Sequence, residues 1–314
     1  MKKTSYLLVA LISLTSLVSA CGSPTNDTFD SLQTGQNIQI NSTEKVSNLA
    51  QKMGLGLNTK GLAHLTEVDQ TEKVTNASLP EKVDLRAGFS PIYNQQNTNA
   101  CVGFATVGGL GEYLMRKKGV KTAFSPRFLW NMGRKLEKSL DQNVGMYFTD
   151  AVKVIDAYGM LPEEDLPFNE KLFAYNPKPT QEELDQQKKD LTEVPTSKMI
   201  QEAKKYKVSQ GWVNINSVHA MKKALSKGFP VVFGVNIYDS FYKTTANGVV
   251  AVPKATEVNH GGHAIVAVGY DNSKRQLIIR NSWGTQWGDK GYAYLPYDFL
   301  KNEDLAFGGF TAKF

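Results

Sequence analysis

The sequence predicts an α+β fold with two lobes, a helical lobe followed by a β-rich lobe. Residues 80–228 carry helical patterns, whereas the chain after Phe229 carries short strand patterns separated by turn residues. Helices and strands that are segregated along the chain are typical of α+β proteins, not of alternating α/β proteins. Of the 314 residues, 41% are hydrophobic, which suffices for a sizeable core and excludes a mainly disordered chain.

The first expected helix of the main domain runs from about residue 101 to 117, with Asn99 as its cap. Four glycines lie within it, at 103, 108, 109 and 111. Each glycine inside a helix costs about 0.5–1 kcal/mol relative to alanine. A helix with four of them needs tertiary packing, so we expect it to be central and buried.

Two further helices are expected. One covers residues 149–158 and ends near Gly159, and the other covers residues 217–226 and is capped by Asn216. Between them, residues 176–207 are polar and rich in Lys, Glu and Gln, which predicts a surface crossover.

The β-rich part contains short runs with strand composition, separated by turn residues such as Asp271-Asn272-Ser273. The expected strands cover residues 230–235, 264–268, 276–280 and 291–295.

The first 20 residues predict an export signal. Two lysines precede an apolar run at residues 7–18, which is too short to span a bilayer of about 30 Å. The run ends in Leu-Val-Ser-Ala-Cys at residues 17–21, which resembles the lipobox of bacterial lipoproteins. The resemblance implies that Cys21 is acylated and anchors an exported protein to a membrane, facing the periplasm or the cell exterior. The alternative is an ordinary signal peptide with an incidental cysteine nearby.

Residues 21–79 form a leader that differs in charge from the rest. The leader has a net charge of −2 and residues 80–314 have +6, without a block of like charges, so we expect no nucleic-acid partner. Residues 21–39 have the composition of a flexible tether, and one amphipathic helix is expected at about residues 42–53.

Two motifs in the β-rich half are specific. Residues 281–288 read Asn-Ser-Trp-Gly-Thr-Gln-Trp-Gly, and residues 262–270 place His263 at the start of an apolar strand. Upstream, Gln95 precedes Cys101 by six residues. This order of Gln, Cys, His and Asn resembles papain-like (C1-type) cysteine peptidases over residues 80–314. The resemblance implies a helical N-terminal lobe, an antiparallel β-barrel-like C-terminal lobe and an active-site cleft between them.

The same resemblance implies a role for each of four residues. Cys101 would be the nucleophile, which attacks as a thiolate and forms a thioester acyl-enzyme. His263 would hold the proton as imidazolium and then pass it to the leaving amine, and Asn281 would orient the imidazole. Gln95 and the backbone N–H of Cys101 would stabilise the oxyanion.

The resemblance also assigns substrate contacts. Gly145 and the adjacent Met146 would pair with an extended substrate, and Gly262 would border the pocket for the side chain two residues before the cut. Trp283 would shield the His–Asn hydrogen bond, and Trp287 would form the wall of the first leaving-group subsite. Because Gly262 brings no charge, we expect that pocket to prefer apolar side chains.

Two positions depart from the family signature. Thr98 stands where the family has a cysteine, and Val102 follows the nucleophile where a tryptophan or tyrosine is usual. Neither change removes a catalytic group. Since only two cysteines are present and Cys21 is expected to be acylated, we expect no disulfide. His260 and His263 form a His-x-x-His pair, but no further ligand lies close in sequence, so we expect no metal and no cofactor.

The function expected from the sequence is that of a monomeric, membrane-anchored cysteine endopeptidase acting on protein or peptide substrates. Two alternatives stay open, namely transamidation or amide hydrolysis on the same triad, and a non-catalytic binding lipoprotein. The leader is either a passive tether or an inhibitory propeptide that lies in the cleft through residues 54–57. In the second case, a cut near residues 76–80 would activate the enzyme and release it from its anchor.

Overall fold

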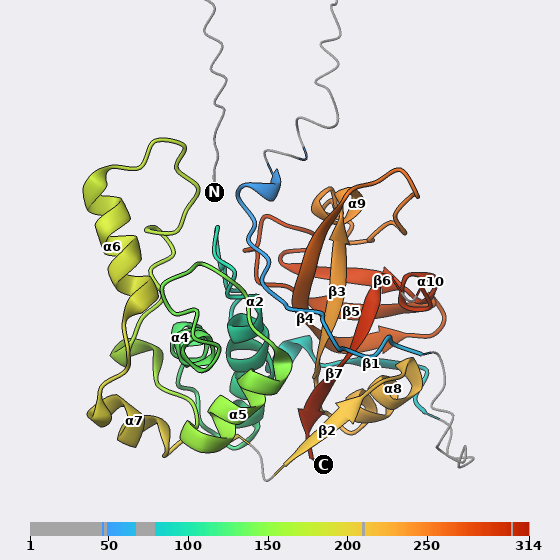
Figure 1. Ribbon diagram of the computed structural model, residues 1–314. Helices are drawn as coiled ribbons and strands as arrows, with labels where there is room; N and C mark the ends of the chain where they lie inside the picture. The colour runs from blue at the N-terminus through green and yellow to red at the C-terminus, as the bar shows by residue number, and fades with distance from the viewer. Residues whose placement is uncertain (1–45, 47–48, 67–78, 209–210, 303, 314) are drawn as a thin grey trace, which may run out of the picture. The chain divides into compact units, whose positions relative to one another are not determined.

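The central element of the fold is the helix that begins at Cys101. The computed structural model describes residues 46, 49–66, 79–208, 211–302 and 304–313 (Figure 1). The helix runs without interruption through three segments, α2 (Cys101–Gly103), the π-helical η2 (Phe104–Gly111) and α3 (Glu112–Lys117). Every residue from Cys101 to Gly111 is buried, as expected for a helix that tertiary packing must hold.

The glycines of this helix allow close packing on both sides. A Cβ at Gly103 would lie 2.6 Å from the carbonyl oxygen of Pro126, and a Cβ at Gly109 would lie 2.6 Å from a methyl group of Val266. The expected cap is wrong, because the N-cap position is Ala100 and the side chain of Asn99 donates to the carbonyl of Asn143 instead.

Two of the remaining helices of the first half pack directly against this central one. The helix expected after residue 149 is confirmed as α5 (Phe148–Tyr158), and Gly159 ends it at φ 79°. The polar stretch expected as a crossover contains two helices, each capped by a threonine hydroxyl. These two helices are α6 (Gln181–Thr192) and α7 (Ser197–Ala203). One helix, α4 (Pro126–Leu136), was not expected from the sequence. Two short 3₁₀ helices are also present, η1 (Arg86–Gly88) and η3 (Glu163–Asp165).

The second half of the chain forms one open antiparallel sheet with the strand order β2-β7-β3-β4-β5-β6, and β1 pairs with β4. All four expected strands are present: two are longer than expected, one has the expected bounds, and one is shifted by a single residue. The strands are β1 (Lys82–Asp84), β2 (Trp212–Ile215), β3 (Val231–Tyr238), β4 (Asn259–Asp271), β5 (Gln276–Arg280), β6 (Tyr292–Pro296) and β7 (Ala306–Ala312). The helices of this half are α8 (Val218–Ser226), α9 (Asp239–Tyr242) and α10 (Tyr297–Leu300). The cap of α8 is Ser217 and not Asn216.

Two hydrophobic clusters form the core. One joins α2–α5 to one face of the sheet and includes Cys101, and the other joins the opposite face to α8, α9 and α10. The start of β4 therefore lies against the N-terminus of α2, which brings His263 close to Cys101.

The part of the leader that the structure describes runs across this junction (Figure 1). Val46, Leu49 and Ala50 are helical, in agreement with the expected amphipathic helix, and Val46 is buried. The export signal, Cys21 and the tether lie outside the described residues. None of the helices that the structure describes is long and apolar enough to cross a membrane.

Candidate active site

Cys101 occupies the first position of α2 and is completely buried. Its Sγ accepts a hydrogen bond from the backbone N–H of Ala264, at 3.3 Å, and Cys101 forms no disulfide. A helix N-terminus favours a thiolate, but burial disfavours the charged form more strongly. The net effect is that burial raises the pKa of the thiol to about 12, so Cys101 is protonated at neutral pH in this arrangement.

The side chains of His263 and Asn281 form the second part of the site. The Nε2 atom of His263 lies 2.8 Å from Oδ1 of Asn281, which also accepts from the backbone N–H of Ser282. The other ring nitrogen, Nδ1, is buried and has no hydrogen-bond partner among the described residues. Asn281 thus fixes the ring and leaves Nδ1 as the nitrogen that can exchange a proton with the thiol. Burial lowers the pKa of His263 to about 4, against the opposing effect of the hydrogen bond that its ring donates to Oδ1 of Asn281.

An aromatic stack covers the His–Asn pair. The ring of Trp283 stacks on His263 at 4.7 Å between centroids, and Tyr242 stacks on Trp283 at 5.2 Å between centroids. Trp283 is 3% exposed. It therefore lies where the resemblance expects a shield over the His–Asn hydrogen bond.

Gln95 is buried beside the nucleophile. Its Oε1 accepts from the hydroxyl of Ser282 at 2.6 Å, which orients the amide so that Nε2 points toward carbonyl oxygens. One of these oxygens belongs to Leu55 of the leader, 3.1 Å from Nε2, and the backbone N–H of Cys101 reaches the same oxygen at 3.4 Å. Two donors at the nucleophile therefore converge on one peptide carbonyl, as an oxyanion site requires.

The leader segment around Leu55 is held on one side by β4, the strand that carries His263. The backbone N–H groups of Gly56 and Leu57 donate to the carbonyl of Gly262, at 3.3 and 3.1 Å. The indole N–H of Trp283 donates to the carbonyl of Gly54 at 3.0 Å.

On the other side, the leader pairs with the loop before α5. The N–H of Met146 donates to the carbonyl of Gly56 at 3.0 Å, and the N–H of Asn58 donates to the carbonyl of Met146 at 3.2 Å. A Cβ on Gly145 would lie 1.9 Å from the oxygen of Gly56, so only glycine permits this approach. The leader thus occupies the groove between the two walls as an extended peptide.

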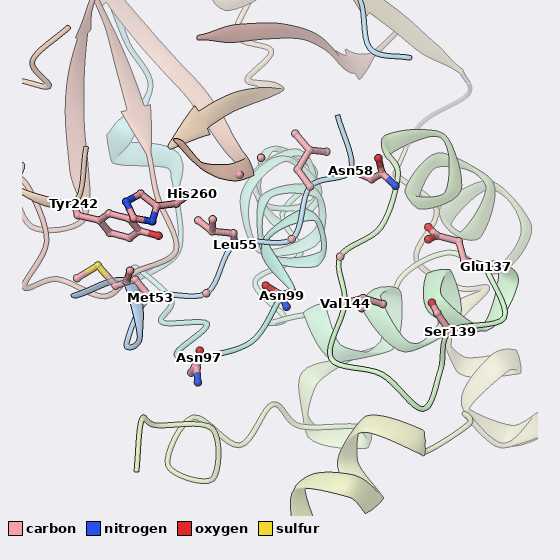
Figure 2. A pocket seen from close by; sticks show the side chains of 17 residues that line it. Met53, Leu55, Asn58, Asn97, Asn99, Glu137, Ser139, Val144, Tyr242 and His260 are labelled. Atoms are coloured by element: carbon pink, nitrogen blue, oxygen red, sulfur yellow. The ribbon is translucent and has the colours of Figure 1, made fainter. Parts of the chain in front are cut away.

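A cavity of about 600 Å³ remains along the leader. Figure 2 shows Tyr242 and His260 on one wall and Glu137, Ser139 and Val144 on the other, with the leader between them. The cavity is what the leader leaves of the cleft, and it marks the two walls that a peptide would contact.

Of the five residues expected to contact substrate, three contact the leader and two are tryptophans buried beside His263 or behind it in the core. Gly145, Met146 and Gly262 all contact the leader backbone, and Trp283 covers the histidine. Trp287 lies behind Trp283, is 2% exposed, and donates its indole N–H to the carbonyl of Phe241 at 3.2 Å.

The sequence did not single out Tyr242 or Asp239. Both lie on the short helix α9, which carries no recognisable motif. Asp239 accepts from Nε2 of His260 at 2.7 Å, so His260 is paired with a carboxylate at the cleft wall. In the part of the chain that the structure describes, no group of three potential metal ligands occurs.

Comparisons with known proteins agree with this geometry. Residues 79–303 match the family model described as papain family cysteine protease. An uncharacterized peptidase C1-like protein of Acanthamoeba polyphaga mimivirus is 31% identical over 194 residues, covering 60% of this chain and 59% of that protein. Cathepsin K of Mus musculus is 26% identical over 226 residues, covering 69% of this chain and 60% of the relative. The chain thus spans about 60% of the length of the curated relatives it matches.

Solved structures share the fold. Xylellain, a cysteine protease from Xylella fastidiosa, matches with a TM-score of 0.65 and 24% identity, covering 83% of this chain and 97% of that chain. The digestive procathepsin L 3 of Tenebrio molitor matches with a TM-score of 0.56 and 17% identity, covering 87% and 80% of the two chains.

Proposed function

Because this chain belongs to the papain family of cysteine proteases, we propose that it is a cysteine endopeptidase whose leader blocks its own active site. The observation that carries the proposal is the carbonyl of Leu55, which accepts from both Nε2 of Gln95 and the backbone N–H of Cys101. A peptide carbonyl held by these two donors lies where the carbonyl of a scissile bond would lie.

The proposed reaction follows from the side chains at this point. With the leader removed, the thiol of Cys101 transfers its proton to Nδ1 of His263, and the thiolate attacks the substrate carbonyl carbon. The oxyanion is held by Gln95 and the N–H of Cys101, and each such donor contributes about 2.7–4 kcal/mol in comparable enzymes. His263 then protonates the leaving amine, and water hydrolyses the thioester. Asn281 keeps the ring oriented throughout.

The leader keeps this machinery in its unreactive form. Under the leader, both Cys101 and His263 are 0% exposed. Burial raises the thiol pKa to about 12 and lowers the imidazole pKa to about 4, so both groups are neutral at pH 7. Since a thiol is a poor nucleophile and a thiolate a good one, the carbonyl of Leu55 can lie beside the sulfur without being attacked.

The leader also supports a substrate preference. The side chain of Leu57 is 6% exposed and packs against Gly234, where an added Cβ would lie 2.7 Å from its methyl group. Leu57 pairs in parallel with Met146 and lies next to Gly262, which the family resemblance places at the pocket for the side chain two residues before the cut. Because Leu57 follows Leu55, the leader reaches this pocket by running through the cleft in the direction opposite to that of a substrate. We therefore expect that pocket to take apolar, branched side chains.

The membrane anchor is the second part of the proposal. Acylation of Cys21 would attach the exported protein to a membrane through the leader, facing the periplasm or the cell exterior. Metabolic labelling with a clickable fatty acid tests this, with Cys21→Ser as the control that should lose the label. A protein that is exported without any label would contradict the anchor and leave the peptidase proposal intact.

The peptidase proposal is tested with protein whose leader has been removed from the cleft. An epoxysuccinyl probe should label Cys101 stoichiometrically, and an extended peptide with leucine two residues before the cut should be hydrolysed. Protein that is labelled at Cys101 but cuts no member of a peptide library would contradict the proposal. Products formed by transfer to an added amine instead of water would indicate a transamidase.

A further inference from the structure

After Met53, the leader contacts the rest of the chain through two stretches that differ in character. Residues 54–58, the cleft stretch, lie where substrate must bind. Residues 63–66, the sheet stretch, lie away from Cys101 and extend the β-sheet. An exposed turn joins the two stretches, and a cut in this turn would separate them.

The sheet stretch pairs with β7 in regular antiparallel fashion. The N–H of Leu65 donates to the carbonyl of Ala306 at 3.1 Å, and the N–H of Gly308 donates to the carbonyl of Ala63 at 2.8 Å. This is strand addition to a part of β7 that lies outside the pairing of β7 with β2, which covers Gly309–Ala312. The sheet is therefore completed by the leader at this position.

Thr66, the last residue of the sheet stretch, forms hydrogen bonds at the start of α8. The N–H of Thr66 donates to the carbonyl of Asn216, and the N–H of Val218, the first residue of α8, donates to the carbonyl of Thr66, both at 2.8 Å. Between these contacts the side chain of Leu65 is 2% exposed and belongs to the core cluster of the β-rich half.

Loss of the sheet stretch would damage the folded domain. The N–H groups of Gly308 and Val218 would lose their partners, and a cavity would open where Leu65 packs. Buried backbone groups without partners and cavities in the core are both destabilising. Residues 63–66 thus form part of the structural domain, although the family match begins only at residue 79.

The two stretches are joined by a tight turn. The side chain of Asn58 accepts from the N–H of Lys60 at 3.2 Å, and the N–H of Leu62 donates to the carbonyl of Thr59 at 3.0 Å. Lys60 and Gly61 at its tip are exposed, Gly61 has φ +77°, and no atom lies within 4 Å of the position of a Cβ on Gly61. Exposed tips of this kind are preferred sites of proteolytic nicking.

We propose that the Lys60–Gly61 turn is the activating processing site of this protein, and that residues 61–66 stay with the mature enzyme as a structural strand. Hydrolysis would break the C–N bond between Lys60 and Gly61, add one water molecule, and leave a carboxylate on Lys60 and an amine on Gly61. The proposal rests on the leader-blocked peptidase proposed above. The agent is a peptidase that accepts lysine before the cut.

The position of the cut determines whether the cleft opens. A cut at Lys60–Gly61 makes the cleft stretch a separate peptide, which loses its effective concentration and dissociates on dilution. A cut between residues 67 and 78 leaves the cleft stretch covalently joined to the sheet stretch, which holds it in place. Only the first cut both frees Cys101 and leaves the sheet complete.

Two matched variants test this. One carries the recognition sequence of a site-specific protease between Lys60 and Gly61, and the control carries the same sequence between Asn76 and Ala77. After each is cut and diluted, size-exclusion chromatography with intact mass measurement shows which fragments stay together. The rate of Cys101 alkylation by iodoacetamide reports whether the cleft is open, independently of any peptidase activity.

The expected result is that the cut after Lys60 releases the leader and raises the alkylation rate of Cys101 by about 100-fold or more, while the control cut changes neither. Equal release and alkylation after the control cut would overturn the proposal, and so would a protected Cys101 after the cut at Lys60. An alkylated Cys101 without peptide hydrolysis would instead contradict the proposed function and leave the processing site standing.

The chain without insertions provides a second test. Brief treatment with trypsin should produce a protein whose N-terminus is Gly61, and Lys60→Gln should prevent that cut and keep Cys101 protected. If the Lys60→Gln protein is opened by trypsin at the same rate as the unchanged protein, the turn is not the activating site.

Discussion

Substitution of Gly56 by alanine should open the active site without any cut. Gly56 has φ +118°, and a Cβ there would lie 2.0 Å from the carbonyl oxygen of Asn99, which is backbone and cannot turn away. A non-glycine residue in so sparsely populated a conformation costs about 1–3 kcal/mol. The clash must also be relieved, which requires the leader to move away from Gly262 and Met146.

The size of the effect follows from the contacts that such a movement breaks. The hydrogen bonds of Gly56 to Gly262 and Met146 contribute about 0.5–1.5 kcal/mol each. Together with the strain, the leader-bound state should lose about 2–6 kcal/mol, and the lower end of this range corresponds to about a 30-fold rise in the open population. Cys101 alkylation in the uncut protein, followed by intact mass, should accelerate by the same factor.

Gly61→Ala is the matched control. Gly61 belongs to the same leader and also has a positive φ, at +77°, but nothing lies within 4 Å of the position of its Cβ, and it lies outside the cleft stretch. Its alkylation rate should stay within about threefold of the unchanged protein. If Gly56→Ala leaves the rate unchanged, or if both substitutions raise it equally, the clash with Asn99 does not govern the blocked state.

Three other substitutions test the site and its surroundings. Cys101→Ala should abolish peptide hydrolysis in leader-free protein but lower the free energy of unfolding by only about 1 kcal/mol, measured by urea titration, because a single small group is lost; residual hydrolysis would point to another nucleophile. Asn281→Ala should lower kcat/KM by about 10–150-fold, since the imidazolium of His263 loses a hydrogen bond worth about 1.5–3 kcal/mol, and an unchanged value would remove Asn281 from the machinery. Burial raises the pKa of Glu163 to about 7 from its usual 4.5, so the folded protein binds more protons than the unfolded chain between pH 4.5 and 7 and loses stability as pH rises through that window. Glu163→Gln, which keeps an acceptor for the N–H of Phe168, should therefore raise the free energy of unfolding by about 1–2 kcal/mol at pH 8 and leave it nearly unchanged at pH 4.5; destabilisation at both values would contradict this.

Motifs with a strict chemical purpose were the most predictable features of the sequence. The triad positions and Gln95 could be found because a nucleophile, a base, an orienting amide and an oxyanion donor need particular residue types in a particular order. The structure brings Gln95, Cys101, His263 and Asn281 together at one point. The strand at residues 276–280 was predicted to the residue, since it is a short apolar run between clear turns.

Helix caps were less predictable, because neighbouring polar residues compete for one role. Asn216 and Ser217 are both good caps by residue type, and in the structure it is the hydroxyl of Ser217 that accepts from the N–H of Ala220. Asn99 is a good cap by type, but its amide bonds to Asn143, which lies far away in sequence. The helix α4 was missed although Ser125 followed by Pro126 is a start signal.

The role of residues 63–66 could not be predicted from the sequence. Strand addition depends on an open position on β7, which is itself the last strand of the chain and had not been foreseen. The alternative that the leader lies in the cleft came from its place before the peptidase-like region that starts at Pro80, and only the structure shows that the same leader also completes the sheet.

The most direct test of the account is an active-site titration of protein cut at Lys60–Gly61. Increasing amounts of an epoxysuccinyl probe are added, and the labelled fraction of Cys101 and the rate of peptide hydrolysis are measured on the same samples. Hydrolysis should fall linearly to zero as labelling rises to one probe per chain, and uncut protein should take up no probe. Hydrolysis that persists when Cys101 is fully labelled, or full labelling of the uncut protein, would contradict it.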